Sequence, residues 1–231
     1  MGYVIEGFRM VFADRRYWRY IVIPWVWSTL IFLAVIVVGY YLFVPSIQGW
    51  IDSRVEGYEG TIRAVVNLAY AGIWFFIAGF VFLTITAVTS SFLWEGLSQR
   101  VEEQITGNPA PKSTLPTIRL ISDSASRGVF SILMAILSLF CGWVVPVVAP
   151  VVLAGWVGLL DYTSPAFLRY NRTVGQQWPS ATKMKGWFGF QVASGLLTLV
   201  PFVNILMLPA LVAGGTVMAV RSGVLKPTQV N

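Results

Sequence analysis

The feature that most constrains this chain is a run of 31 uncharged residues from Ala64 to Trp94. A helix needs about 20 predominantly apolar residues to cross a bilayer, so this run is long enough. Residues 21–44 form a second uncharged run, and its 24 residues would make a helix about 36 Å long. The chain is 56% hydrophobic and only 11% charged, whereas about a quarter of the residues of a soluble domain are charged. The sequence therefore predicts an all-α integral membrane protein with two long transmembrane helices.

The second span should continue beyond the membrane. Leu93, Leu97, Val101 and Ile105 recur every four residues through the polar stretch that follows Trp94. This spacing is typical of one face of a helix, and the pattern stops at Gly107-Asn108-Pro109, a helix-ending signal. We therefore expect one helix over residues 64–106, with a cytoplasmic extension, in a chain whose residues 1–231 form a single membrane domain.

Two further apolar runs, residues 128–160 and 187–220, are interrupted by residues that break helices. The interruptions are Pro146 and Pro150 in the first run and Pro201, Asn204 and Pro209 in the second. Proline removes a backbone donor and clashes with the preceding turn, so each run should fold as a helical hairpin. Measured from the prolines, three of the four arms are too short to span, which predicts partly penetrating hairpins unless the helices continue into the polar flanks.

Residues 1–20 combine an amphipathic pattern with a basic cluster. Four apolar residues share one helical face, namely Val4, Phe8, Val11 and Phe12. Their spacing predicts a short N-terminal amphipathic helix on the membrane surface. Three arginines then stand directly before the first span, namely Arg15, Arg16 and Arg19.

The three arginines suit two roles. Guanidinium groups, together with backbone N–H groups at a helix N-terminus, donate directed hydrogen bonds to a small anion. Arginines beside a span also contact the anionic headgroups of the lipid bilayer and so anchor the helix. Arg15, Arg16 and Arg19 are therefore the candidate anion-binding residues, and lipid anchoring is the alternative.

The basic residues also predict the orientation of the chain. Fourteen of the 16 Lys and Arg residues lie in residues 1–20, 95–127, 161–186 and 221–231. Basic residues accumulate in cytoplasmic loops of membrane proteins. We therefore expect both termini and the open ends of both hairpins to be cytoplasmic in a multi-pass protein.

Two polar residues stand out within or beside the hairpins. Asp161 is the only acid that adjoins either apolar run, so it either pairs with Arg169 or Arg172 or acts as a proton-coupled carboxylate. Asn204 lies between two prolines, where its amide would satisfy freed backbone groups or line a pore. Together with Pro146, Pro150, Pro201 and Pro209, these residues are the hairpin candidates for a transport path.

The hairpins share a faint internal repeat. Pro150-x-x-x-Ala154-Gly155 in the first recurs as Pro209-x-x-x-Ala213-Gly214 in the second. Paired, proline-broken apolar segments are typical of transport sites, because broken helices expose free carbonyls and helix ends at membrane depth. Alternatively, the small residues serve only to let helices pack closely.

Several functional classes are excluded by residue types that are missing. The sequence has no histidine and a single cysteine, Cys141, so zinc clusters and Ser-His-Asp or Cys-His pairs cannot form. It contains no phosphate-binding loop of the nucleotide hydrolases. The net charge of +6 lies beside apolar segments and not on an aromatic-rich basic face, which argues against nucleic-acid binding. We expect no enzyme activity, cofactor or metal.

Four stretches resemble one known family. The most specific is Pro201-Phe202-Val203-Asn204-Ile205-Leu206-Met207-Leu208-Pro209-Ala210, and the others are Leu97 to Gly107, Val148-Ala149-Pro150 with Asp161-Tyr162, and Gly7 to Val11 with Ile23-Pro24. In this order they resemble the CysZ sulfate-permease and etoposide-induced-protein family. The turn before the first span reads Arg16-Tyr17-Trp18-Arg19 where that family has Gly-Leu-Arg-Arg, so the chain is similar to a divergent member.

The resemblance implies two long spanning helices, two partly penetrating hairpins and a homo-oligomer. In the bacterial branch it also implies uptake of sulfate for cysteine synthesis. We therefore expect an anion permease or channel of the inner membrane, with sulfate as the leading substrate and no nucleotide hydrolysis. The alternative, suggested by the eukaryotic branch, is a membrane scaffold or adaptor without transport activity.

Overall fold

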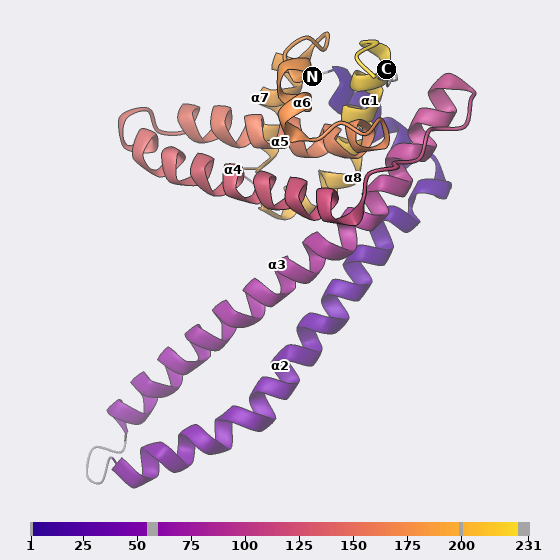
Figure 1. Ribbon diagram of the computed structural model, residues 1–231. Coiled ribbons are helices and arrows are strands. Elements are labelled where there is room, and N and C mark those ends of the chain that lie inside the picture. Colours follow the sequence, from indigo (N-terminus) through magenta and orange to yellow (C-terminus); the bar gives the residue numbers. More distant parts are fainter. Residues whose placement is uncertain (1, 55–59, 199–200, 226–231) are drawn as a thin grey trace. The chain divides into compact units, whose positions relative to one another are not determined.

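All regular secondary structure of the described residues is helical. A computed structural model describes residues 2–54, 60–198 and 201–225, and none of them lies in a strand. The helices are α1 (Gly2–Ala13), the short 3-10 helix η1 (Arg15–Tyr17), α2 (Arg19–Arg54), α3 (Thr61–Thr106), α4 (Thr117–Val144), α5 (Val148–Arg169), α6 (Val174–Ala181), α7 (Trp187–Thr198) and α8 (Pro201–Arg221) (Figure 1). The all-α prediction is confirmed, and α3 runs as one continuous helix of 46 residues.

The chain divides into two compact units. One unit comprises Met1–Ile21 with Leu93–Asn231, and the other comprises Val22–Phe92. The second unit holds most of α2 and the first part of α3. These two helices meet where the buried Gly39 lies against the indole ring of Trp74. All the sites described below belong to the first unit.

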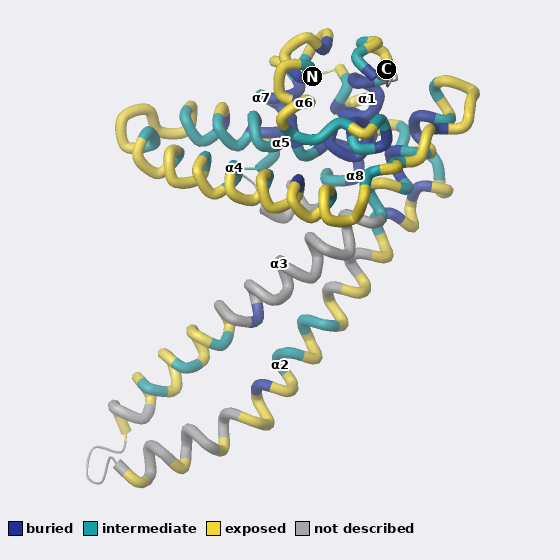
Figure 2. Tube along the Cα trace, in the orientation of Figure 1, coloured by how far each residue is buried: buried dark blue, intermediate teal, exposed yellow. Residues whose placement is uncertain are grey.

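The apolar surface of the first unit is concentrated on α4. Among the residues that the structure describes, α4 and α5 are the two helices long and apolar enough to cross a membrane. Two shorter apolar segments, Thr29–Leu42 of α2 and Ala64–Phe75 of α3, lie within the two predicted long spans. Most side chains of α4 are exposed, including those of Ile132, Leu133 and Phe140 (Figure 2). Exposed apolar faces of this kind are typical of helices that contact lipid.

The first predicted hairpin is present, with longer arms than its prolines suggested. The chain turns at 145–147, and Val147 there has a φ of 71°, in the left-handed region. Pro150 falls within the first turn of α5, where proline costs no intrahelical hydrogen bond. Both helices continue into the polar flanks, so α4 has 28 residues and α5 has 22. At 1.5 Å per residue they are about 42 and 33 Å long.

The second predicted hairpin differs from expectation at one proline. Its first arm, α7, has 12 residues, and its second arm, α8, begins at Pro201, whereas we expected the second arm to begin after Pro209. We expected an interruption at Pro209, but α8 continues through it to Arg221. The residues that follow Pro209, from Ala210 to Ala219, are all buried. Packing along this buried face offsets the hydrogen bond that the proline removes.

Glycines allow the closest helix contacts of the first unit. A Cβ built on Gly155 of α5 would overlap the carbonyl oxygen of Gln191 in α7, and one on Gly195 of α7 would overlap that of Val151. Similarly, Gly214 of α8 faces the backbone of Tyr3 in α1. Gly155 and Gly214 are the glycines of the internal repeat, so in the described structure both repeats serve close helix packing.

The N-terminal helix α1 packs against the first unit with only part of its predicted apolar face. Val4, Gly7 and Val11 are the buried residues of α1, and Gly7 lies against the backbone of Ala210 and Gly214 in α8. Phe8, which the sequence places on the same apolar face, is exposed and stacks on Phe12 at 4.4 Å between ring centroids. The α1 face is therefore set by close approach to α8, which favours glycine over a large side chain.

The glycine contacts predict a difference between two identical substitutions. Gly155→Ala should destabilise the protein by about 1–3 kcal/mol, because α5 and α7 must separate to admit the methyl group. Gly128→Ala in α4 has no neighbouring atom within 4 Å and should be neutral or stabilising by up to about 1 kcal/mol, since alanine favours helix. Thermal unfolding of both purified variants measures the difference, and equal stability would contradict the close contact.

Candidate functional site

Two of the three predicted arginines line a polar hollow. Arg16 of η1 and Arg19 of α2 border a pocket of about 720 Å³, and Arg100 of α3 borders it as well. Asp14 caps η1, because its Oδ1 accepts a hydrogen bond of 2.9 Å from the Arg16 backbone N–H. Arg15 does not line the hollow. The arginine cluster of the sequence is thus split between the hollow and the surface.

The walls of the hollow are held by tyrosines. The Tyr17 hydroxyl donates a 2.6 Å hydrogen bond to Gln104 Oε1, which ties η1 to the end of α3. Burial, reinforced by the charge of Asp14, raises the pKa of Tyr17, so this hydroxyl stays a neutral donor at physiological pH. Arg19 Nη2 donates to the Tyr20 hydroxyl at 3.0 Å, and its guanidinium lies 4.9 Å from the centroid of the Tyr20 ring. The ring thereby restricts where Arg19 can point.

The hollow carries a small positive excess. Three guanidinium groups, those of Arg16, Arg19 and Arg100, face two carboxylates, those of Asp14 and Glu103. Glu103 also accepts a 2.9 Å hydrogen bond from Gln99 Nε2. Sequence reasoning missed Arg100, although it lies on the polar side of the four-residue repeat. No local sequence pattern predicts which residues will pack against the polar side of α3.

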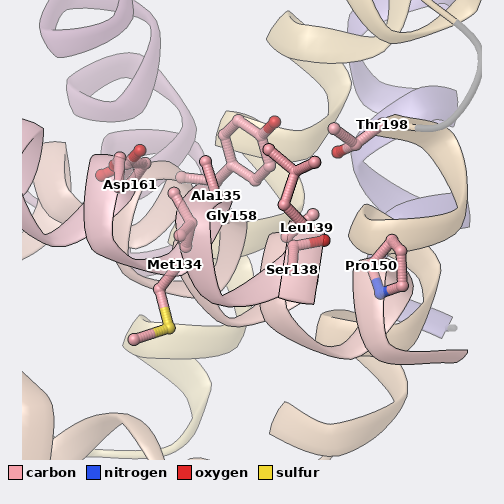
Figure 3. Close-up of a pocket in the computed structure, with 12 residues that line it drawn as sticks. Met134, Ala135, Ser138, Leu139, Pro150, Gly158, Asp161 and Thr198 are labelled. Atoms are coloured by element: carbon pink, nitrogen blue, oxygen red, sulfur yellow. The ribbon is translucent and has the colours of Figure 1, made fainter. Parts of the chain in front are cut away.

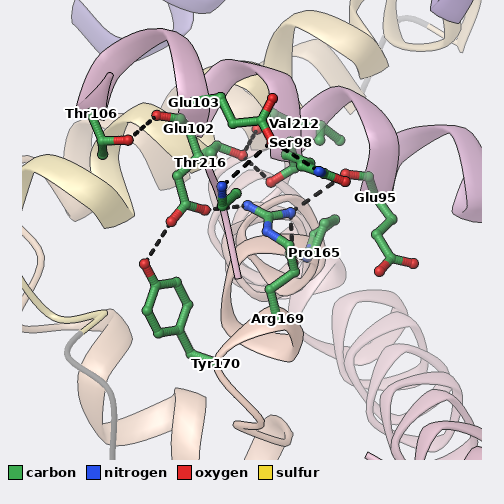
Figure 4. A network of polar contacts seen from close by, with 12 residues as sticks. Glu95, Ser98, Glu102, Glu103, Thr106, Pro165, Arg169, Tyr170, Val212 and Thr216 are labelled. Carbon is green, nitrogen blue, oxygen red and sulfur yellow. Dashed lines mark hydrogen bonds and ion pairs between the residues drawn. The ribbon is translucent and has the colours of Figure 1, made fainter. Parts of the chain in front are cut away.

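A buried ion pair joins α3 to the end of α5. Glu102 is 1% exposed and Arg169 is 2% exposed, and Arg169 Nη2 lies 2.5 Å from Glu102 Oε2 (Figure 4). The Tyr170 hydroxyl donates to Glu102 Oε1 at 2.6 Å, and Arg169 Nη1 donates to the Pro165 carbonyl oxygen at 3.1 Å. The Glu102 carboxylate therefore receives a donor on each oxygen, which offsets its removal from water.

A second polar contact joins α3 to α8. The hydroxyls of Ser98 and Thr216 lie 2.6 Å apart, and both side chains are fully buried. Leu97 and Val101, predicted to share the apolar face of this helix, are also fully buried. The end of α3 is thus packed within the first unit through both apolar and polar residues. No role was predicted for Glu102 from the sequence.

Asp161 is paired differently from our prediction. Its Oδ1 lies 4.0 Å from Nη1 of Arg127 in α4. The predicted partners are engaged elsewhere, since Arg169 binds Glu102 and Arg172 Nη1 donates to the Val224 carbonyl at 2.9 Å. Arg127 lies four residues after Asp123 on one face of α4, and this spacing predicts a pair between those two residues but not the approach of Arg127 to Asp161.

Arg127 is held mainly by groups other than Asp161. Its Nε lies 2.7 Å from Asp123 Oδ2, and its Nη2 donates to Gln177 Oε1 of α6 at 2.6 Å. Gln177 in turn donates to the Leu160 carbonyl oxygen at 2.7 Å. The short helix α6, which we did not predict, supplies this glutamine. Its start carries the Thr-x-x-Gln signature at 173–176, and the Thr173 N–H donates to Gln176 Oε1 at 3.4 Å.

The hairpin candidates have different surroundings. Asp161 and Pro150 line a second pocket of about 530 Å³, together with Thr198 of α7 (Figure 3). Pro146 is exposed in the turn between α4 and α5, and Pro209 is buried in α8. The side chains of Pro201 and Asn204 lie outside the described residues. Two of the six hairpin candidates therefore share a pocket.

Breaking the buried ion pair should cost far more than breaking an exposed one. Arg169→Met leaves Glu102 buried without its cation, and we expect a loss of about 3–5 kcal/mol of stability. Arg221→Met is the matched control, because Arg221 pairs with Glu6 at 2.6 Å near the surface. Its loss should be below about 1 kcal/mol. Chemical unfolding of both variants provides the comparison, and similar losses would show that the buried pair is not structural.

The Tyr170 hydroxyl should lose its proton at a higher pH than an ordinary tyrosine does. Burial and the hydrogen bond to the Glu102 carboxylate raise the pKa of Tyr170 from 10.0 to about 12. Because the folded pKa is raised, this group contributes stability that is complete below about pH 10 and is lost as the pH rises towards 12. Phenolate absorbance of the folded protein, minus that of Tyr170→Phe, should show one titration near 12. A difference titration centred on 10 would contradict the contact.

Comparison with known proteins supplies the family. None of the curated proteins matches the chain. A family model described as "Sulfate transporter CysZ/Etoposide-induced protein 2.4" matches residues 3–209 of the 231. The match includes the arginine cluster, both spans, the first hairpin and the start of α8. The chain therefore belongs to the sulfate transporter CysZ/etoposide-induced protein 2.4 family of membrane proteins, as its sequence motifs predicted.

Proposed function

We propose that this protein is an anion permease or channel of the bacterial inner membrane, with sulfate as its substrate. The observation that carries the proposal is the hollow in which Arg16, Arg19 and Arg100 converge from three helices. The family description names a sulfate transporter, which favours this substrate over other small anions. Uptake of sulfate would supply sulfur assimilation, and the ion gradient would provide the energy.

The chemistry of the hollow suits a tetrahedral oxyanion. Guanidinium groups donate hydrogen bonds in a fixed planar geometry. Because these bonds are charge-assisted, they bind an anion more strongly than hydrogen bonds from neutral donors do. Arg19 also begins α2, so the positive end of the helix dipole adds to the side-chain charges there. A hollow of about 720 Å³ exceeds the volume of one sulfate, which leaves room for bound water. We infer a site that binds the anion weakly enough to release it.

The distribution of basic residues supports the proposed topology. Both termini and the open ends of both hairpins would be cytoplasmic, because fourteen of the 16 basic residues lie in those segments. The hollow belongs to the same side, since η1 precedes the first span. It would therefore bind the anion at the cytoplasmic end of its path. The family resemblance further suggests a homo-oligomer, in which the exposed apolar face of α4 would contact lipid or a second copy.

Transport by reconstituted protein tests the proposal. Protein in liposomes should take up radiolabelled sulfate saturably, and Arg19→Gln and Arg100→Gln should each raise the apparent KM about tenfold or more. The reason is that each variant removes a charge-assisted hydrogen bond worth about 1.5–3 kcal/mol. Arg15→Gln is the matched control, because it removes the same charge from the same cluster outside the hollow.

Two results would contradict the proposal. An equal effect of Arg15→Gln would assign the arginines to lipid headgroups and not to an anion site. Uptake no greater than that of protein-free vesicles, by protein that remains folded and oligomeric, would exclude sulfate permeation. A membrane scaffold or adaptor without transport would then be the better description.

A further inference from the structure

The pocket that contains Asp161 is a groove along the first hairpin. Its residues on α4 follow helical spacing, namely Ser131, Met134, Ala135, Ser138 and Leu139. Those on α5 do the same, from Pro150 through Ala154 and Val157 to Asp161. Pro150 and Asp161 are the first and last of twelve residues, so eleven helical rises, or about 16 Å, separate them. Figure 3 shows Asp161 at one end of the row and Pro150 with Thr198 at the other.

The two ends of the groove differ in polarity. The Pro150 end leads to the apolar turn of the hairpin, where Trp143 is 88% and Val144 is 82% exposed. The Asp161 end leads to Arg127 and Asp123. Beside that end, Trp178 follows the Gln177 that binds Arg127, and its ring contacts Trp156 of α5 at 5.1 Å between centroids. Clustered tryptophans are typical of the membrane–water interface, so the groove should run from the interface into the hydrocarbon.

The carboxylate at the polar end is only partly neutralised. Among the residues that the structure describes, Arg127 is the one cation in an ion pair with Asp161, at 4.0 Å. The same guanidinium makes a shorter contact of 2.7 Å with Asp123, whose side chain is almost fully buried. One positive charge thus serves two carboxylates, and this triad carries a net charge of −1. Asp161 is the exposed member, with 36% of its side chain accessible.

We propose that this groove binds an amphiphile whose ammonium group pairs with Asp161 and whose hydrocarbon chain lies between α4 and α5. The cationic head supplies the charge that the triad lacks, and the apolar walls of Met134, Leu139 and Val157 bury the chain. An anionic head would meet a net negative charge. A neutral head would leave the carboxylate unsatisfied.

The same chemistry has two natural sources. One is a free lipophilic amine, and the other is the headgroup amine of phosphatidylethanolamine in the surrounding bilayer. Both present N–H donors on a primary ammonium group, which is joined directly to the hydrocarbon in the amine and through a phosphate and glycerol in the lipid. The groove shares no residue with the arginine hollow, so this inference does not depend on the proposed anion transport.

Binding of radiolabelled decylammonium tests the proposal. The full-length protein is placed in phosphatidylcholine nanodiscs, and binding to protein-free nanodiscs is subtracted. We expect Asp161→Asn to weaken decylammonium binding about tenfold while binding of decanol is unchanged. Asp161→Asn keeps the size of the side chain and leaves Arg127 paired with Asp123, so the fold should persist. Glu95→Gln, at an exposed carboxylate of α3, is the matched control and should change nothing.

A second variant tests the hydrocarbon part of the groove. Ala135 is exposed on the α4 wall, so Ala135→Leu should fill the groove without disturbing buried packing. It should weaken decylammonium and decanol alike, by about tenfold. The proposal is overturned if Asp161→Asn leaves decylammonium binding unchanged, or if wild-type protein binds decylammonium no more tightly than decanol.

Lipid analysis separates the two sources. Protein in nanodiscs of equal phosphatidylethanolamine and phosphatidylcholine is released and its retained lipids are identified by native mass spectrometry. Enrichment of phosphatidylethanolamine that disappears in Asp161→Asn would identify the lipid headgroup as the occupant. Binding of decylammonium without such enrichment would identify a free lipophilic amine. Both results support the ammonium site.

Discussion

The ion pair between Glu102 and Arg169 is the interaction on which the arrangement of the first unit most depends. Two charges taken out of water cost several kcal/mol each, and only close pairing with further hydrogen bonds offsets that cost. Tyr170 and the Pro165 carbonyl provide those bonds. Since the two charged residues lie 67 positions apart in the sequence, the pair can form only when the end of α3 meets the end of α5. Arg100 is carried by that same end of α3, so the pair also fixes one wall of the arginine hollow.

Close packing through glycine complements this charged contact. At α5 with α7 and at α1 with α8, backbones approach so nearly that no side chain fits between them. Helices in a bilayer gain little from burying apolar surface, because lipid tails are equally apolar, so close backbone packing and polar contacts must hold them together. This explains why α8 tolerates Pro209. Its buried face gains enough from packing to outweigh one lost backbone hydrogen bond.

Features that depend on neighbouring residues in the sequence were predicted, whereas contacts between distant residues were not. Apolar runs and stop signals are local, so the sequence predicted α3 to its last residue and the turn at Pro146. The position of Pro209 inside α8 was missed because its tolerance depends on partners far along the chain. The partner of Asp161 was missed for the same reason, since Arg127 reaches it only when α4 and α5 lie antiparallel. Arg16 and Arg19 were predicted from a local cluster, whereas Arg100 needed the tertiary structure.

The two pockets of the first unit differ in the sign of their charge, because each lies beside an unequal number of acidic and basic groups. Three guanidinium groups and two carboxylates line the hollow, whereas at the polar end of the groove Asp161 shares the guanidinium of Arg127 with Asp123. Each cluster therefore carries one unit of charge in excess, positive at the hollow and negative beside the groove. Beside the groove, the ion pair between Asp123 and Arg127 reduces the cost of holding charge near apolar surface. An isolated charge in such a setting would be neutralised by a proton instead. A small anion and an ammonium amphiphile would therefore bind to one molecule without competing for the same residues.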